Sequence, residues 1–312
     1  MKMNFNLLIV SLFLIVYSVN CELDADDCPE PELIKPCHCD REGLSCFNEL
    51  TEDNLAKVFQ VNSQFKAYRS VWITQNPIKQ LTANIFNGYR VFNFLIEEND
   101  LETINEDTFS GSYPIIKEMS LYKNNISYFP FQELQLMTSL EKLSLQSNRL
   151  TTIPANSFSL APQLKQIDLT NNQIDSIAPG AFFGMKNLEI ILLSNNRLEK
   201  IPALAFGSIQ TQFQIDLSGN EISFIDPTAF SASLPAVISL ADNQLTFLDP
   251  NVFKTPIQIG STLVVPGNPF TCKGCSDYRW LLSVRSTQVQ GFQCSSGRKL
   301  SELNLLNIGC LF

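Results

Sequence analysis

The fold of this chain is decided by LEKLSLQSNRL at residues 140–150, LKQIDLTNNQI at 164–174 and LEIILLSNNRL at 188–198. The three stretches share one pattern, Leu-x-x-Leu-x-Leu-x-x-Asn-x-Leu with Ile at some apolar positions, and each starts 24 residues after the last. A fixed period of this length is typical of a solenoid. Each repeat is too small to bury a core alone and must be covered by its neighbours.

The alternation within one repeat assigns its side chains to two faces. Leu143 and Leu145 are expected to point inward from a short strand, with Ser144 between them facing outward. Asn148 follows the strand, where its amide can satisfy backbone groups that no regular element pairs. Period and pattern together predict leucine-rich repeats, with a ladder of buried Asn side chains.

Eight such repeats are expected between about Tyr68 and Ile259. Their ladder residues are Asn76, Asn99, Asn124, Asn148, Asn172, Asn196, Asn220 and Asn243. Ten residues after each Asn stands an apolar residue expected to form a buried spine, Phe86, Phe109, Leu134, Phe158, Phe182, Phe206, Phe230 and Phe253. An aromatic ligand site is the alternative, but one residue per repeat is what packing requires. Thr211–Phe213 and Pro235 break the first leucine position, so the strands there are expected to start late.

These expectations define an α/β-type solenoid. Strands about 4.8 Å apart would line one face, and bulkier returning segments would curve the stack. The predicted shape is a horseshoe with a parallel concave sheet and an irregular convex side. The predicted domains are a signal peptide at 1–21, an N-terminal cysteine-rich cap at 22–67, the repeats at 68–259, and a last repeat strand with a C-terminal cap at 260–312.

The N-terminal segment has the features of a secretory signal. Lys2 precedes an apolar run from Leu7 to Val19, which is too short to span a bilayer. Cleavage after Ser18 or after Cys21 would satisfy the small-residue rule. Cleavage after Cys21 is preferred because it leaves eight of the nine cysteines.

Cysteines flank the repeats on both sides. Residues 28–46 contain CP-x7-CxC-x6-C, and residues 268–310 contain NPFxC, a CxxC and two further cysteines. In a secreted chain this usage predicts disulfide caps over the open ends of the solenoid. Zinc at Cys37, His38 and Cys39, or a redox role for the CxxC, are the alternatives. Trp280 and Leu281 are expected to cover the last coil, and no apolar tail for a membrane anchor follows Cys310.

These features resemble the extracellular leucine-rich repeat superfamily with cysteine-rich flanks, over about residues 28–310. The resemblance implies the pairs Cys28–Cys39, Cys37–Cys46, Cys272–Cys294 and Cys275–Cys310. The C-terminal cap departs from the family in having two residues, Lys273 and Gly274, between its first cysteines, where the family usually has one.

A narrower resemblance rests on CPEPELIKPCHC at 28–39 and YFPFQEL at 128–134. These stretches are similar to an arthropod group of secreted repeat proteins named after the non-catalytic subunit of Oplophorus luciferase. The resemblance implies a secreted, non-enzymatic protein and, as an alternative function, a stabilising subunit of a small secreted enzyme.

Composition argues against catalysis and against nucleic acid. The net charge is −9 and no run of Lys or Arg is present, whereas polyanion binding needs basic patches. The only histidine, His38, lies between two cap cysteines. Asp168 and Asp216 share one repeat position two coils apart and could suggest an acid/base pair, but solvated surface is the preferred interpretation. No cofactor or metal motif is recognised, so none is predicted.

The sequence also predicts surface sites. Asn125-Ile126-Ser127 is a glycosylation acceptor. Outward strand positions carry large apolar or charged residues where small polar ones would suffice, and these are the candidate partner-binding residues, Trp72, Leu95, Tyr122, Asp168, Ile190, Leu192 and Asp216. We expect an extracellular protein partner on this concave face, and a face-to-face homodimer is compatible with the same surface. Ordinary solvent-facing variation is the alternative.

Overall fold

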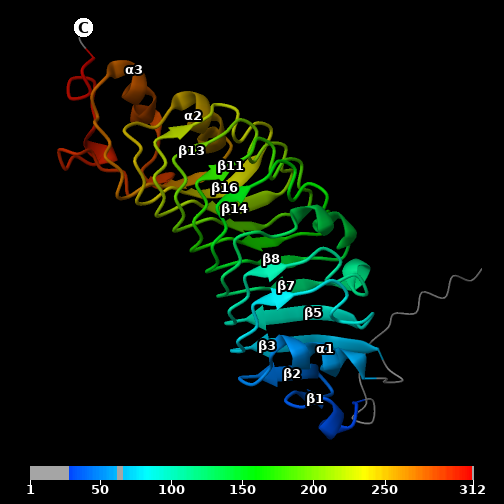
Figure 1. Ribbon diagram of the computed structural model, residues 1–312. Coiled ribbons are helices and arrows are strands. Elements are labelled where there is room, and N and C mark those ends of the chain that lie inside the picture. The colour runs from blue at the N-terminus through cyan, green and yellow to red at the C-terminus, as the bar shows by residue number, and fades with distance from the viewer. Residues whose placement is uncertain (1–27, 62–65, 311–312) are drawn as a thin grey trace, which may run out of the picture.

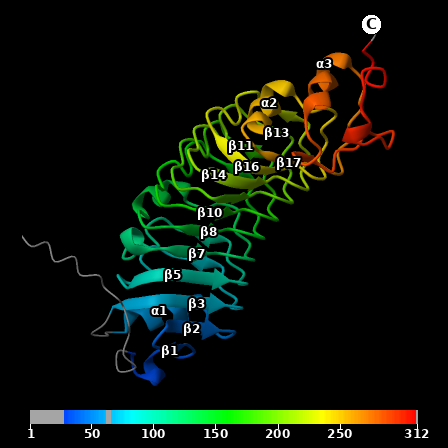
Figure 2. The ribbon, with the colours of Figure 1, turned by 180° about the vertical axis from the view of Figure 1, so that it is seen from behind.

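The computed structural model describes residues 28–61 and 66–310 of the chain. Figure 1 shows coils stacked in chain order from the blue N-terminal end to the red C-terminal end, and Figure 2 shows the same stack from behind. The predicted signal peptide and the start of the N-terminal cap lie outside the described residues. Within the described ranges, no helix is long and apolar enough to cross a lipid bilayer.

One 12-stranded sheet runs the length of the stack. Its neighbouring strands are parallel, except that β1 pairs antiparallel with β2. In sheet order the strands are β1 (His38–Asp40), β2 (Gly43–Phe47), β3 (Ala67–Thr74), β5 (Arg90–Glu97), β7 (Glu118–Ser120), β8 (Lys142–Ser144), β10 (Gln166–Asp168), β12 (Ile190–Leu192), β14 (Gln212–Asp216), β16 (Leu234–Ser239), β17 (Thr262–Val264) and β18 (Val289–Gln290).

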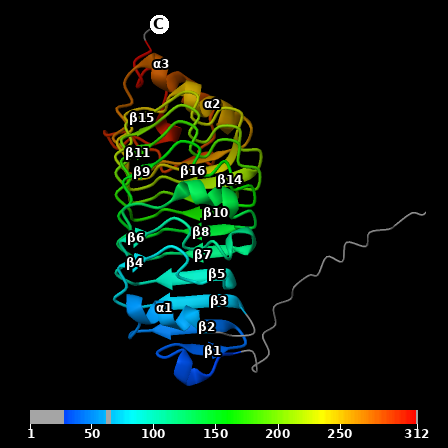
Figure 3. The same cartoon turned by 45° about the vertical axis from the view of Figure 1, so that its right-hand side comes forward.

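The return side of each coil is irregular, as predicted, and it lies opposite the large sheet (Figure 3). It carries two-residue strands that pair in twos, β4 (Gln80–Leu81) with β6 (Thr103–Ile104), β9 (Thr152–Ile153) with β11 (Ser176–Ile177), and β13 (Lys200–Ile201) with β15 (Phe224–Ile225). The helices are α1 (Glu52–Gln60), α2 (Pro250–Gln258) and α3 (Cys275–Tyr278), with 3-10 turns η2 (Pro31–Leu33), η3 (Tyr113–Ile115), η4 (Phe131–Leu136), η5 (Arg279–Ser283) and η6 (Leu300–Glu302).

The Asn ladder is present, and it joins consecutive coils. The Asn148 Nδ2 donates to the carbonyls of Leu121 at 2.9 Å and Leu145 at 3.1 Å. Its Oδ1 accepts the N–H of Ile126 at 3.0 Å. All eight predicted ladder residues are buried. The ladder also extends one coil further, because Asn268 makes the same contacts to Leu240 and Leu245.

The predicted Phe spine is buried beneath the return side. Phe158, Phe182, Phe206 and Phe230 form a continuous stack with ring centroids 4.8, 5.2 and 5.5 Å apart. Leu134 interrupts the column, and Phe131 from the same turn fills the gap with an edge-to-face contact to Phe158 at 5.5 Å. This compensation keeps the core continuous through the irregular coil.

The prediction that two strands start late is wrong. β14 begins at Gln212 and β16 at Leu234, so both begin earlier in their coils than β12 does. Phe213 occupies the inward first position in place of Leu and is fully buried. The register between β14 and β16 shifts between Phe213 and Gln214, so that β16 has one more residue than β14 over the paired stretch.

Four disulfides close the two ends of the solenoid. The pairs are those that the family resemblance implies, Cys28–Cys39, Cys37–Cys46, Cys272–Cys294 and Cys275–Cys310. At the C-terminal end Leu281 is buried, as expected. Trp280 also covers the last coil, as expected, since it packs against the edge of the core and its indole donates to the carbonyl of Leu248, while the side chain remains partly exposed.

Candidate protein-binding face

The outward side chains of β3, β5, β7, β8, β10, β12 and β14 form a surface that we call the sheet face. Strand register places one residue from each strand side by side in a central row. In order, this row is Trp72, Leu95, Ser120, Ser144, Asp168, Leu192 and Asp216. Inward neighbours such as Leu143 and Ile191 are buried, whereas row members such as Leu95 and Leu192 are partly exposed.

Four of the predicted binding residues form two apolar groups rather than one patch. Trp72 and Leu95 are direct register partners at the N-terminal end of the row. Ile190 and Leu192 lie two residues apart on β12 and face the same way. Leu95 and Leu192 are four strand steps apart, or about 19 Å at the usual strand spacing. Two apolar patches therefore flank a more polar stretch of the sheet face.

Tyr122 lies outside the central row. It follows β7, and its carbonyl accepts the N–H of Glu98 at 2.9 Å, which puts it in the next row towards the ends of the strands. Its side chain is partly exposed. Tyr122 thus borders the polar stretch and does not belong to either apolar patch.

A shallow hollow of about 230 Å³ occupies the polar stretch between the two patches. Its outward side chains come from β5 to β12 and are Glu97, Glu118, Ser120, Lys142, Ser144, Gln166, Asp168, Ile190 and Leu192. The hollow exists because Ser120 and Ser144 are small where their row neighbours are large. Three carboxylates and one ammonium group line it, so it is acidic.

Asp168 and Asp216 do not form an acid/base pair in this arrangement. Leu192 stands between them in the strand register. Each carboxylate also accepts a backbone N–H two residues on, from Thr170 at 2.9 Å and from Ser218 at 3.0 Å. The two aspartates therefore stabilise the turn after their strands.

Charges alternate along the edge where the strands begin. Backbone hydrogen bonds place Lys117, Glu141, Lys165 and Glu189 in consecutive coils. The Lys165 Nζ is 2.7 Å from Glu141, and this hydrogen bond is the main reason that the pKa of Glu141 is lowered and the pKa of Lys165 is raised. Because this edge neutralises itself, the negative charge of the sheet face is concentrated in the hollow.

A second ion pair lies at the other edge of the strands. The Lys123 Nζ is 3.1 Å from Glu98. The hydrogen bond from Lys123 lowers the pKa of Glu98 and correspondingly raises that of Lys123. Both side chains are exposed enough to exchange this pair for contacts with another molecule.

The residues that sequence reasoning missed are the small and amide side chains of the hollow. Ser120, Ser144 and Gln166 occupy outward strand positions, but their small or neutral side chains do not stand out in the sequence as large or charged ones do. The available signal was the run of serines at one repeat position in consecutive coils. Ser120 also donates its hydroxyl to Glu97, which orients that carboxylate at the rim.

Two other predicted positions lie away from the sheet face. His38 is exposed on β1, between Cys37 and Cys39, both of which are in disulfides. Asn125 follows ladder residue Asn124 and is partly exposed, and its N–H donates to the carbonyl of Leu101 at 2.8 Å. Its side chain is therefore within reach of solvent.

Comparison with known proteins agrees with this geometry. The leucine rich repeat family matches residues 90–150, 138–198 and 186–233. This chain has the leucine-rich-repeat fold. Among solved structures it resembles a chain from an octameric complex of Latrophilin 3, Unc5D and FLRT2 (LRR) at 21% identity, with a TM-score of 0.62 over 91% of this chain and all of that one. It also resembles a chain of the TLR13–ssRNA13 complex at 20% identity, with a TM-score of 0.60 over 72% of this chain and 32% of that one.

A relative in sequence is the Oplophorus-luciferin 2-monooxygenase non-catalytic subunit of Oplophorus gracilirostris. It is 30% identical over 120 residues, which are 36% of this leucine-rich-repeat chain and 33% of the relative. The match thus spans about a third of the length of that relative. It agrees with the narrower resemblance found in the sequence.

Proposed function

We propose that this leucine-rich-repeat chain is a secreted, extracellular, non-enzymatic protein that binds a protein partner through its sheet face. The proposal includes the domain limits predicted from the sequence, with removal of residues 1–21, and glycosylation at Asn125. The observation that carries it is the pairing of partly exposed Ile190 and Leu192 with an acidic hollow beside them. Apolar anchors next to oriented polar groups are typical of interfaces.

The chemistry of the hollow favours one kind of partner. An apolar side chain of the partner would pack on Ile190 and Leu192, and a Lys or Arg next to it would face Asp168 and Glu118. Nucleic acid is disfavoured, because the chain has a net charge of −9 and the hollow has three carboxylates against one ammonium group. The RNA in the TLR13 complex belongs to that protein and does not carry over to this acidic face.

The decisive experiment is capture of the partner with wild-type protein and with Leu192→Lys. A lysine at this position leaves the backbone unchanged and can extend its ammonium group into solvent, so the protein should still fold. The substitution replaces an apolar contact of the interface by a cation. The matched control is Leu160→Lys, which makes the same change at an exposed position on the return side. We expect Leu192→Lys to weaken binding at least about tenfold, a loss typical of an interface anchor. Equal binding by both folded variants would disprove the proposal.

A second function is favoured by the relative named above, a non-catalytic subunit by its name. In this alternative the partner is a secreted enzyme that the chain stabilises. Purification of the native complex separates the two functions, because a stabilising subunit should copurify with a small enzyme in fixed stoichiometry. Recovery of a receptor or matrix protein instead would support the first function.

A further inference from the structure

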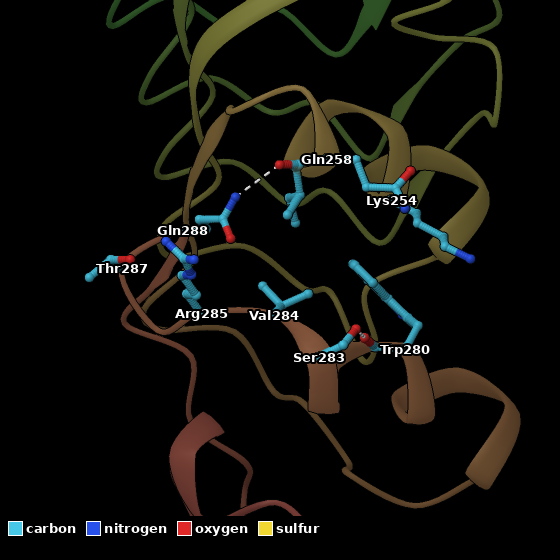
Figure 4. Close-up of a pocket in the computed structure, with 9 residues that line it drawn as sticks. Lys254, Gln258, Trp280, Ser283, Val284, Arg285, Thr287 and Gln288 are labelled. Atoms are coloured by element: carbon cyan, nitrogen blue, oxygen red, sulfur yellow. Dashed lines mark hydrogen bonds between the residues drawn. The ribbon is translucent and has the colours of Figure 1, made fainter.

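A pocket on the return side, at the C-terminal end, differs from the sheet face in shape and in charge. It lies between α2 and the segment that runs from η5 to β18, and its volume is about 500 Å³. Figure 4 shows Lys254 and Arg285 on opposite sides of it, with Val284 and Trp280 between them. This volume lies within the range of small-molecule sites, about 300–1,000 Å³.

The walls of the pocket are held in place by hydrogen bonds. The Trp280 indole Nε1 donates to the carbonyl of Leu248 at 3.2 Å, which fixes the orientation of the ring at the pocket wall. The Gln288 amide donates to the carbonyl of Ile257 in α2 at 2.9 Å and so ties the segment before β18 to the helix. The cavity is therefore built into the C-terminal cap and does not require a loop to move.

The electrostatics of the pocket oppose those of the whole chain. Its lining residues include Lys254 and Arg285 and no carboxylate, although the chain has a net charge of −9. Within the described ranges neither cation takes part in an ion pair. Two such cations beside an apolar wall are suited to a ligand with one anionic group and one apolar part.

We propose that this pocket binds a small organic anion with an apolar body, such as an aromatic or aliphatic carboxylate, sulfonate or sulfate. The apolar body would lie against Trp280, Val284 and Ile257. The anionic group would contact Lys254 or Arg285, and Gln258 and Ser283 offer further polar groups at the rim. The site is separate from the sheet face, so this proposal does not depend on the proposed partner binding.

The test is fluorescence titration of the full-length secreted protein with 8-anilinonaphthalene-1-sulfonate, which has an apolar ring system and one sulfonate. The matched probe is N-phenyl-1-naphthylamine, which lacks the charge. We expect saturable binding of the sulfonate with quenching of Trp280 emission, measured in a Trp72→Phe background. We also expect the affinity for the sulfonate to fall as the salt concentration rises. The neutral probe should bind at least about tenfold more weakly, because a hydrogen-bonded charge contact contributes a binding free energy of that order.

Two variants locate the site. Lys254→Gln with Arg285→Gln should weaken the sulfonate about tenfold or more and leave the neutral probe unchanged, because both side chains are exposed and folding does not need them. The control is Lys273→Gln with Arg279→Gln, which removes two exposed cations of the same cap that do not line the pocket. Val284→Phe, which narrows the cavity at its apolar wall without changing charge, should weaken the binding of both probes.

Three results would overturn the proposal. The first is no saturable binding of the sulfonate to the folded protein. The second is equal affinity for the charged and neutral probes, which would make the pocket merely apolar. The third is an equal loss of sulfonate affinity in the Lys273/Arg279 control, which would show that binding depends on the net charge of the cap and not on the pocket. Near-ultraviolet circular dichroism on every variant separates loss of binding from loss of fold.

Discussion

The inside and the outside of the same coils follow different rules. Inside, the coils from Asn148 to Asn220 repeat one set of contacts, in which each ladder Asn bonds equivalent backbone groups and the rings from Phe158 to Phe230 stack on one another. Outside, the central row of the sheet face changes from aromatic to aliphatic, then to small polar, to acidic and back to aliphatic between Trp72 and Leu192. The difference shows that the repeated residues build the solenoid, whereas the side chains that vary between coils are free to serve recognition.

The largest effect should come from breaking the spine. Phe182→Ala removes a fully buried ring stacked between Phe158 and Phe206, and the cavity left behind should destabilise the protein by about 3–5 kcal/mol. Urea unfolding with disulfides intact measures it. A loss of unfolding free energy below about 1 kcal/mol, the size expected for a surface substitution, would mean that the buried spine tolerates substitution as well as the sheet face does.

The second largest effect should come from disrupting the Asn ladder. Asn172→Ala leaves the carbonyls of Leu145 and Leu169 and the N–H of Leu150 without their side-chain partner. Buried unsatisfied groups are costly, and we expect a loss of about 2–4 kcal/mol. The control is Gln173→Ala, because Gln173 is the partly exposed residue that follows this ladder residue in the same turn, whereas Asn171 before it has a positive φ that alanine disfavours. Similar losses at the two positions would contradict the distinction between ladder and surface.

A change on the sheet face should separate stability from binding. Leu192→Lys is expected to alter the free energy of unfolding by less than about 1 kcal/mol, because the side chain is only partly buried and lysine can extend to water. The same variant is expected to lose partner binding. A large loss of stability instead would show that Leu192 belongs to the core, and it would remove the basis for the proposed interface.

The smallest effect concerns the charged edge of the sheet. The pKa of Glu141 is lowered by Lys165, so the pair stabilises the fold above the ordinary glutamate pKa of 4.5 and is lost as the pH falls through the lower folded value. The urea midpoints of wild type and Glu141→Gln should differ slightly at pH 7 and coincide at pH 2 or in 1 M salt. A difference that persists at pH 2 would show that the pair does not account for it.

Most of the fold could be predicted because the pattern has one physical cause. Leu143, Leu145 and Asn148 recur at a period that only a stacked coil can bury, so the sheet, the ladder and the spine follow from sequence alone. The same reasoning failed at Pro235, because a proline at the first leucine position says nothing about where the strand begins. Phe213 occupies that inward position in the preceding coil, and a register shift permits both early starts.

The candidate sites were less predictable from the sequence. Outward positions could be recognised one by one, but the separation of Trp72 and Leu95 from Ile190 and Leu192 depends on the number of strands between them. The hollow depends on two serines that are unremarkable on their own. The C-terminal pocket depends on Lys254 and Arg285, which are 31 residues apart in the sequence and line one cavity only because the cap folds back on α2.

The sequence alone determined the repeated interior, because buried side chains must repeat wherever the backbone repeats, and it indicated disulfide caps at both ends. The tertiary structure decided which outward residues become neighbours, where the sheet face is hollowed, and how the last cap leaves a positively charged pocket in an acidic protein. These features arise from the register between neighbouring strands and from the packing of the non-repeating cap. The spacing of the repeats along the sequence specifies neither of them.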